Sequence, residues 1–364
     1  MIESRHLQLV VTIAETGSLS KAAHRLNLTQ SALSHQLRSL EDRLEIAVFH
    51  RQGSRLTFTA AGREVLDRAR SILREVSRLE DRMAELRQNA ARRYIHGYSE
   101  REARRLGDQA ATMADLLHFD SRWPAGSRIL EIGCGVGAQT AIIATLNPDC
   151  QIVAIDVSAP SLAVAKKRID ELGIRNVEFR QADIREYILR PPAAFDYALV
   201  CFLLEHLSAP GEVLTGIKSL LRPGGQITVI EGDHGTVLLH PDDDAARKLV
   251  EGQVSLQASR GGNANIGRAL YPLLREAGYS PIHVQPRQMY VDGSKPELVE
   301  GFIRNTFIAM IEGMTSEMIE AGIRTPSEVE AGLRGLARTA AATGSFSYTF
   351  FRAVATASAG GAAD

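Results

Sequence analysis

The stretch EIGCGVGAQT, residues 131–140, decides the fold of most of this chain. It follows the apolar residues Ile129 and Leu130 and leads into the helix-forming residues 141–144. We therefore predict a strand, a glycine-rich turn and a helix, in which the backbone can approach a ligand because no Cβ atoms stand in the way. Asp156 ends the next apolar run, at about the twenty-residue distance at which an acid takes ribose hydroxyls. The pattern predicts a nucleotide-binding turn.

Two kinds of nucleotide-binding domain share this spacing. Ala138 can stand for the third small residue of the dehydrogenase pattern G-x-G-x-x-G/A. Glu131 argues against that reading, because a carboxylate just before the first glycine would repel a pyrophosphate. Asp183 ends a further strand-like segment, where it is placed to accept from an exocyclic amine. The turn LRPGG, residues 221–225, then leads directly into another apolar run.

The combination resembles the class I S-adenosylmethionine-dependent methyltransferases. It consists of E-x-G-x-G-x-G, Asp156, Asp183, FDYALVCF at residues 195–202 and LRPGGQITVIE at residues 221–231. The resemblance covers residues 94–354 and implies a Rossmann-like α/β domain, with a seven-stranded sheet whose last strand is antiparallel. It implies S-adenosyl-L-methionine as the cofactor. The positions that it implies for the cofactor site are Tyr94, Glu131, Gly133, Gly135, Asp156, Val157, Asp183, Ile184 and Cys201.

Strand-like and helical segments alternate between residues 128 and 231. Alternation at these lengths predicts a parallel sheet with helices on both faces, and ligands then bind at the carboxyl ends of the strands. Two insertions interrupt the pattern, at residues 235–267 and 295–342. We expect both to enclose a substrate above the cofactor, since segments at strand ends carry specificity.

Three residues are candidates for a catalytic base. Methyl transfer is an in-line displacement in which a protein supplies alignment, a dry site and in some cases a base. His206 follows the fourth strand, and Asp233 with His234 follows the fifth in a predicted loop bracketed by glycines. His206 has a structural reading as well, since it could satisfy a nearby backbone group. No spacing of cysteines or histidines indicates a metal site.

The acceptor is expected to be a small molecule. An enzyme that methylates a base amine in DNA needs an Asn/Asp-Pro-Pro-aromatic loop after the fourth strand, to hold a flipped base. Here the corresponding residues 201–204 read CFLL. The acceptor atom stays open.

The first 60 residues have a different pattern. Apolar residues recur at helical spacing in residues 7–15, and Ser18 and Thr29 are placed to cap helices over residues 19–26 and 30–44. Strand-like segments then lie on both sides of a glycine turn, which indicates a hairpin. The order predicts a winged helix-turn-helix.

This part resembles the LysR-type transcriptional regulators, through residues 17–41, FHR at residues 49–51 and residues 56–62. In that family the third helix enters the major groove of double-stranded DNA, which is therefore the expected partner. The resemblance implies base contacts from Gln30, Ser31, Ser34 and His35, and phosphate contacts from Arg38, Arg51 and Arg55. One departure is Glu45, where the family usually has glycine; an acid there is expected to weaken contact with the DNA backbone.

Residues 61–92 predict a dimerisation helix. Apolar residues from Val65 to Ala90 recur at alternating spacings of four and three, a stripe that suits a two-stranded seam and a homodimer. LysR-type regulators pair through such a helix but continue into a two-lobed sensor, which a methyltransferase-like domain replaces here. The expected domains are a winged helix at residues 1–60, the helix at 61–92, a methyltransferase domain at 93–354 and a disordered tail at 355–364.

Composition agrees with these expectations. With 364 residues, 45% of them hydrophobic, the chain can bury more than one core. No apolar run approaches a membrane span and no cleavable apolar segment opens the chain, so a cytoplasmic protein without membrane contact is expected. Residues 1–92 carry 15 Lys and Arg against 11 Asp and Glu, a basic bias that permits binding to an acidic polymer.

Three readings of the whole chain stay open. In the first, a DNA-binding protein carries a catalytic domain that methylates a small metabolite. In the second, the methyltransferase-like domain only senses S-adenosylmethionine or another ligand. In the third, the winged helix serves dimerisation alone, as in plant-type O-methyltransferases, because a fold does not fix a function.

Overall fold

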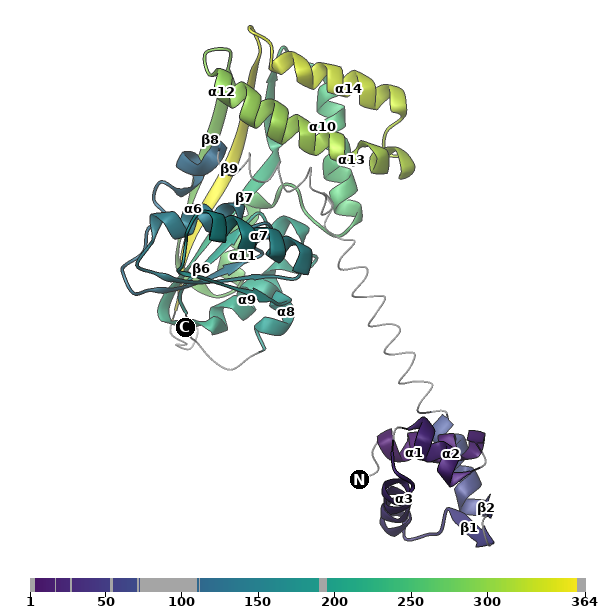
Figure 1. The fold of residues 1–364 in the computed structure, drawn as a ribbon. Helices are drawn as coiled ribbons and strands as arrows, with labels where there is room; N and C mark the ends of the chain where they lie inside the picture. Colours follow the sequence, from purple (N-terminus) through teal and green to yellow (C-terminus); the bar gives the residue numbers. More distant parts are fainter. Residues whose placement is uncertain are drawn as a thin grey trace. The chain divides into compact units, whose positions relative to one another are not determined.

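The computed structural model describes residues 4–52 and 55–72, apart from residues 17, 27 and 71, and residues 110–358, apart from residues 111 and 190–194. The chain divides into two compact units, residues 1–91 and 92–364. Figure 1 shows the fold of each. Most of the predicted dimerisation helix, Tyr94 and the last six residues lie outside the described residues.

The smaller unit is a helix-turn-helix with a hairpin, as predicted. Its elements are α1 (Ser4–Thr16), α2 (Leu19–Arg25), α3 (Gln30–Leu44), β1 (Phe49–Gln52) and β2 (Arg55–Phe58). Leu9, Leu33 and Leu37 are fully buried between the helices. The predicted cap at Thr29 is confirmed, because its Oγ1 accepts from the Ala32 amide at 3.1 Å. Ser18 is the N-cap residue of α2, as predicted, but its side chain makes no cap bond, and α2 ends at residue 25.

Glu45 ends α3 in the left-handed region, with φ of 54° and ψ of 25°. Glycine adopts this conformation without penalty, whereas a residue with a Cβ pays roughly 1–2 kcal/mol. The position where the family usually has glycine is therefore a helix C-cap. Glutamate at this position strains the backbone at the end of α3.

The larger unit is built on a seven-stranded sheet. Its strands are β3 (Arg128–Ile132), β4 (Gln151–Asp156), β5 (Val177–Gln181), β6 (Phe195–Cys201), β7 (Leu221–His240), β8 (Tyr279–Asp292) and β9 (Ser345–Ala357). They lie in the order β5-β4-β3-β6-β7-β9-β8, and neighbours from β5 to β7 are parallel. β9 runs antiparallel to both β7 and β8. The predicted Rossmann-like sheet with an antiparallel last strand is confirmed.

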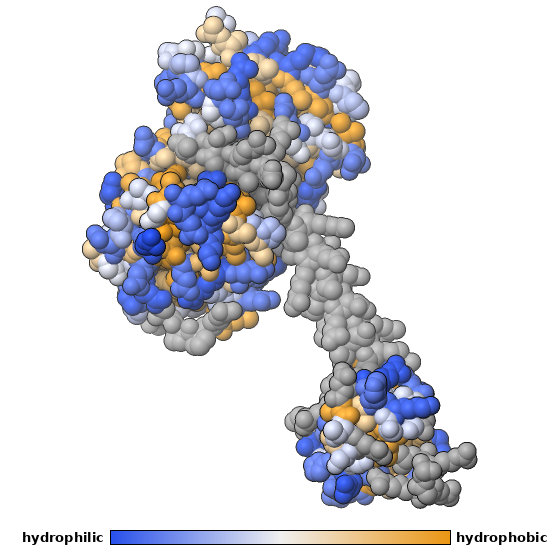
Figure 2. Space-filling model, in the orientation of Figure 1, coloured by the Kyte–Doolittle hydropathy of each residue, from blue (hydrophilic) through white to orange (hydrophobic). Residues whose placement is uncertain are grey.

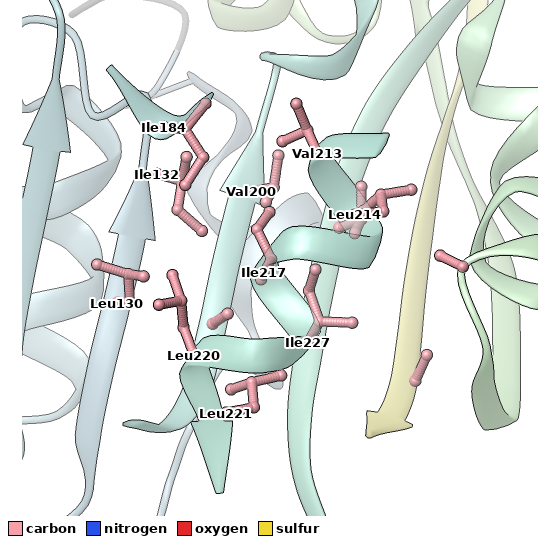
Figure 3. Packing of buried hydrophobic residues seen from close by; sticks show 14 of the residues in the cluster. Leu130, Ile132, Ile184, Val200, Val213, Leu214, Ile217, Leu220, Leu221 and Ile227 are labelled. Carbon is pink, nitrogen blue, oxygen red and sulfur yellow. The ribbon is translucent and has the colours of Figure 1, made fainter. Parts of the chain in front are cut away.

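Helices cover both faces of this sheet. α9 (Pro210–Leu220) buries Val213, Leu214 and Ile217 on one face, and Figure 3 shows them against side chains from β3, β6 and β7. α6 (Ala138–Leu146) packs on the other face through Ile143. α7 (Ala159–Glu171) and the short α8 (Ile184–Tyr187) complete the alternation. The strand order reverses beside β3, where ligands bind in sheets of this kind.

Two of the strands are much longer than predicted. β7 continues to residue 240 and β8 spans residues 279–292, so both run with β9 beyond the parallel core to a second group of helices (Figure 1). That group contains α10 (Asp244–Ser259), α12 (Pro296–Leu298), the π-helix η3 (Val299–Ile308), α13 (Ala309–Glu320) and α14 (Pro326–Thr339). A capping box formed by Thr325 and Glu328 begins α14. β9 also includes residues 355–357, so the expected tail boundary fell inside a strand.

Between the sheet and α11 (Leu270–Glu276) lies the short 3-10 helix η2 (Ile266–Ala269). The visible surface of both units mixes hydrophilic residues with scattered hydrophobic ones (Figure 2). Among the described helices, none combines the length and apolar character that crossing a membrane requires.

Candidate functional site

The glycine turn after β3 is shaped by three residues with positive φ. Gly133, Gly135 and Gly137 have φ of 74°, 52° and 71°. A Cβ at Gly137 would lie 2.8 Å from the Cβ of Ala165 in α7, whereas a Cβ at Gly135 would meet no atom within 4 Å. Gly137 therefore permits close helix packing, and Gly135 borders open space from which a ligand could approach the backbone.

Asp156 at the end of β4 holds this turn. Its Oδ2 accepts from the Gly135 amide and its Oδ1 from the Ser158 amide, both at 2.8 Å. Burial raises the pKa of the carboxyl, and the Ser158 and Gly135 amides oppose that rise. Each oxygen keeps a further lone pair, so the group can still accept from a ligand.

Glu131 lies buried at the end of β3. Its Oε2 has no hydrogen-bond partner among the described residues. Burial raises the pKa of Glu131 to about 7, against the Thr140 hydroxyl, and the charge of Asp156 raises it further. Two carboxyl groups therefore flank the glycine turn, as the sequence predicted.

The Asp183 carboxylate is already hydrogen-bonded to Arg185. Its carboxylate accepts from the Arg185 Nε at 2.9 and 3.1 Å and from the Arg185 amide at 2.9 Å. The Arg185 guanidinium holds the pKa of Asp183 below its usual range. An exocyclic amine would have to share this carboxylate, which differs from the free acceptor expected from sequence.

The other expected cofactor positions divide by exposure. Val157, directly after β4, is 49% exposed, whereas Ile184 is buried in the core beside α9. Cys201 ends β6 in a buried position, and burial raises the pKa of its thiol well above the ordinary value. All three cysteines are free and buried. Of the described residues, no group of three or more acids, histidines and cysteines could hold a metal ion.

The ends of β6 and β7 form a second polar region. Phe202 follows β6 with a φ of 55°, a strained conformation for a residue with a Cβ. The chain then turns so that the Leu203 and Leu204 amides donate to Glu231 Oε1 at 2.9 and 2.7 Å. Glu231 is fully buried, and its Oε2 has no partner in the part of the chain that the structure describes. Burial raises its pKa well above the ordinary value, helped by the charge of Glu205.

The predicted loop that carries Asp233 and His234 is a strand. Both residues belong to β7, where Asp233 pairs with Thr349 of β9 before the register shifts. The Asp233 side chain is fully buried and accepts from Arg268 Nε at 2.6 Å and Nη2 at 2.7 Å. A carboxylate held in this way is committed to an ion pair, so the expectation of Asp233 as a base was wrong.

His234 is held in one orientation and one tautomer. Its Nδ1 lies 3.1 Å from the Ala264 carbonyl oxygen and 3.1 Å from the Tyr348 hydroxyl. Because a carbonyl can only accept, Nδ1 carries the proton and Nε2 presents a lone pair. Nε2 is buried and has no partner among the residues described. Burial lowers the pKa of the ring, which keeps it neutral.

A chain of hydrogen bonds connects Glu205 to α10. The Gln257 Nε2 donates to the Glu205 carbonyl at 2.9 Å, and the Gln253 Nε2 donates to Gln257 Oε1 at 3.0 Å. His206 Nε2 lies 3.6 Å from Glu205 Oε1, in the short 3-10 helix η1 (Leu204–His206). His206 thus lies beside a carboxylate, whereas its structural reading expected a backbone group, and its role stays a prediction.

The expected base-reading residues lie on one helix. Ser31, His35 and Arg38 are exposed on α3, spaced by about one and two turns, and Ser34 is half-buried. The buried leucines of α3 occupy its opposite face. Arg51 and Arg55 belong to the β1–β2 hairpin, but their side chains and that of Gln30 lie outside the described residues.

Sequence reasoning missed Gln253, Gln257, Glu205 and Tyr348. Gln257, Glu205 and Tyr348 stand in ordinary helical or strand patterns with no glycine or proline beside them, and Gln253 follows Gly252 inside a helical pattern. A polar residue on an otherwise apolar helix face, such as Gln253 between Val250 and Leu256, was the available signal.

Two family models match the chain. Residues 4–63 match the bacterial regulatory helix-turn-helix proteins of the LysR family, and residues 124–278 match a methyltransferase domain. The second match covers the glycine turn, both carboxylates beside it and His234. It supports S-adenosylmethionine, the cofactor expected from the sequence.

Relatives resemble the chain in whole or in part. It is 28% identical to an uncharacterised 37.1 kDa protein in transposon Tn4556 of Streptomyces fradiae, over 80% of this chain and 81% of that protein. It is 38% identical to the transcriptional regulator MetR of Haemophilus influenzae over 25% of this chain, and 36% identical to a ubiquinone biosynthesis O-methyltransferase of Paraburkholderia phymatum over 28%. The chain spans only 29% and 43% of the length of these two relatives.

Among solved structures, a Haemonchus contortus phosphoethanolamine N-methyltransferase is similar with a TM-score of 0.45 at 19% identity, over 68% of this chain and 52% of that one. The two family matches occupy separate stretches, one in each compact unit. The chain is a fusion of a LysR-type helix-turn-helix domain and a methyltransferase domain.

Proposed function

We propose that this protein transfers a methyl group from S-adenosylmethionine to a small molecule, and that its winged helix binds DNA. The observation that carries the enzymatic part is the combination of a turn built to hold a cofactor with a buried histidine whose Nε2 is an unpaired lone pair. Each is an ordinary feature alone. Together they supply a place for the donor and a base for the acceptor.

The residues around the glycine turn fit this cofactor. Open space beside Gly135 admits a ligand to the backbone, and Asp156 keeps lone pairs for two ribose hydroxyls. Glu131 offers an unpaired, buried oxygen to a donor such as an amino group. When bound, the cofactor supplies an electrophilic methyl group on a sulfonium.

His234 is the residue that we assign as the base. A hydroxyl, thiol or amine that donates to Nε2 becomes a better nucleophile as its proton moves to the ring. The charges of Glu205 and Asp233 raise the pKa of His234, against the effect of burial, and so stabilise the imidazolium once it forms. The Ala264 carbonyl keeps the ring in position throughout.

Incubation of the full-length protein with radiolabelled S-adenosylmethionine and a panel of phenols, catechols, amines and thiols tests the enzymatic proposal. Transfer to at least one compound, lost in His234→Ala, would support it. Tight cofactor binding without transfer to any compound would favour the sensor reading instead.

The DNA-binding proposal rests on the exposed face of α3 and has its own test. Replacing Ser34 and His35 together by alanine should reduce discrimination between sequences, because these side chains are proposed to reach bases. Arg51→Ala should weaken binding to all sequences and lower the salt dependence by about one phosphate contact. If the gel shifts of both variants are unchanged, the proposed DNA contacts are contradicted. The reading of the winged helix as a dimerisation device would then be favoured.

A further inference from the structure

Gln253 in α10 is a buried polar residue to which the proposed function gives no role. Its side chain is fully buried, and its Nε2 donates to Gln257 Oε1 at 3.0 Å. Its Oε1 is buried too and finds no donor within the described ranges, 4–72 and 110–358 with their gaps. A buried carbonyl oxygen without a donor is costly and rare in folded proteins, which points to a donor that arrives with a ligand.

The orientation of the Gln253 amide follows from its neighbours. The Glu205 backbone carbonyl can only accept, so the Gln257 amide must turn its nitrogen toward that carbonyl, at 2.9 Å. Gln257 Oε1 then faces Gln253, which must present its own nitrogen. A flip of the Gln253 amide would place two oxygens against each other. The free atom of Gln253 is therefore an acceptor.

The same logic fixes His234, and Glu205 connects the two. The Glu205 carbonyl also accepts from the Asn263 amide at 2.8 Å, and the next residue, Ala264, orients His234 through its own carbonyl. The Tyr348 hydroxyl lies 3.1 Å from His234 Nδ1, and the Glu205 carbonyl binds both Asn263 and Gln257, so these groups lie in one network. This network presents two buried lone pairs, His234 Nε2 and Gln253 Oε1.

We propose that Gln253 determines acceptor specificity: the acceptor carries a second hydrogen-bond donor, a hydroxyl or an N–H, which binds Gln253 Oε1. The first donor is the group that gives its proton to His234, so this proposal rests on the proposed function. The acceptor class is a diol, a catechol or an amino alcohol.

The charges of the region narrow that class further. The carboxyl groups of Glu205 and Asp233 act on His234, and Arg268 is already held by Asp233. An acceptor with a phosphate or carboxylate group would meet these carboxyls without a free cation among the described residues of the network. Neutral and cationic acceptors are therefore favoured.

Calorimetry on the full-length protein saturated with S-adenosylhomocysteine tests the proposal with two matched pairs of probes, catechol with phenol and 2-aminoethanol with ethylamine. In each pair the first compound has one more donor. At least one two-donor probe should bind about tenfold or more tightly than its partner, because an analogue that lacks the donor leaves Gln253 Oε1 unpaired.

The Gln253→Met variant should reduce that ratio to about twofold or less, because methionine fills a similar volume without an acceptor oxygen. Gln151→Met is the matched control, since Gln151 is exposed at the start of β4, and it should keep the wild-type ratio. Thermal melts of both variants establish that they fold. If Gln253→Met does not fold, the wild-type ratios alone decide.

Equal binding of both members of each pair, no binding by either two-donor probe, or an unchanged ratio in Gln253→Met would overturn the proposal. In the last case Gln253 Oε1 holds no more than an internal water. Failure of the proposed function is distinguishable, because it appears as absent S-adenosylhomocysteine binding or absent methyl transfer, whereas the probe ratios measure recognition alone.

Discussion

The two polar regions at the carboxyl ends of the sheet are built in different ways. Around β3 and β4, Asp156 is satisfied by amides 2 and 21 residues away in the chain. Around β6 and β7, Glu231 accepts from amides 27 and 28 residues away, and His234 contacts Tyr348, 114 residues further on. The proposed cofactor end, around β3 and β4, is thus assembled from residues up to 21 positions apart, whereas the proposed acceptor end, around β6 and β7, draws on residues up to 114 positions apart.

The two regions should therefore respond differently to substitution. A local turn needs particular backbone conformations, which glycines and one carboxylate provide. A network of distant residues needs every partner in place, because each buried group that loses its partner is left unsatisfied. Five tests follow, from the largest expected effect to the smallest, and the first four probe this contrast.

Asp156→Ala should weaken S-adenosylhomocysteine binding by roughly a thousandfold, because two charge-assisted hydrogen bonds to the ribose are lost at about 1.5–3 kcal/mol each. Asp183→Ala should cost no more than about tenfold, since Arg185 already occupies that carboxylate. Calorimetry measures both, with DNA binding as the control for folding of the smaller unit. Equal losses in the two variants would contradict the distinction between the carboxylates.

His234→Ala should lower kcat by about 100-fold to 1000-fold while changing cofactor affinity less than about twofold, because a base acts on the acceptor alone. His206→Ala is the matched control and should cost only a few-fold. Transfer to an acceptor found in the radiolabel panel gives both values. A larger loss of kcat in His206→Ala than in His234→Ala would indicate that His206 is the base.

The pH profile of the wild-type protein checks the same assignment. Burial lowers the pKa of His234 from its ordinary value of 6.5, and the base must be neutral to accept a proton. Activity should therefore be retained as the pH falls to 6.5 and should decline only below it. A decline that begins above pH 7 would indicate a different base.

Gly137→Ala should lower the free energy of unfolding of the larger unit by about 2–3 kcal/mol, from a left-handed backbone and a Cβ 2.8 Å from that of Ala165. Gly135→Ala should lower it by only about 1–2 kcal/mol, because its Cβ enters open space. The second variant should nevertheless lose the cofactor about tenfold or more. Urea denaturation and calorimetry separate the two, and the reverse ranking of stabilities would refute the packing argument.

Glu45→Gly should stabilise the smaller unit by about 1 kcal/mol, because glycine adopts the left-handed C-cap of α3 without a Cβ penalty. Slower amide hydrogen exchange near the end of α3, in the full-length protein, measures this gain. Glu45→Ala keeps the Cβ and should give no such gain. Equal protection in both variants would assign the effect to charge.

The glycine turn after β3 has the open backbone that the sequence predicted, whereas its role in cofactor binding stays a prediction. Positive φ at Gly133, Gly135 and Gly137 is a property of the turn itself, and the bond from Gly135 to Asp156 follows from the pairing of the consecutive strands β3 and β4. Asp183 was the exception, because the pattern could not reveal that Arg185 would take its carboxylate.

The acceptor end was predicted less well. Two glycines around Asp233 and His234 indicated a loop, but the segment lies within β7, which pairs with β9 up to Asp233 and again from Leu238. The same folding brought Arg268 onto Asp233, which removed it as a base. The expected homodimer, DNA contacts and domain boundaries stay predictions.

The sequence by itself determined both domains, the order of the elements and the turn that faces the cofactor, because spacing, glycines and caps act over a few residues. Only the tertiary structure decided which buried groups remain without a partner. The Ala264 carbonyl orients His234, and the Glu205 carbonyl orients Gln257, which in turn orients Gln253. These carbonyls come near only when α10 and the segment after it pack against the end of β6. Burial and distant hydrogen bonds, which no short stretch of sequence contains, set the chemistry of the acceptor end.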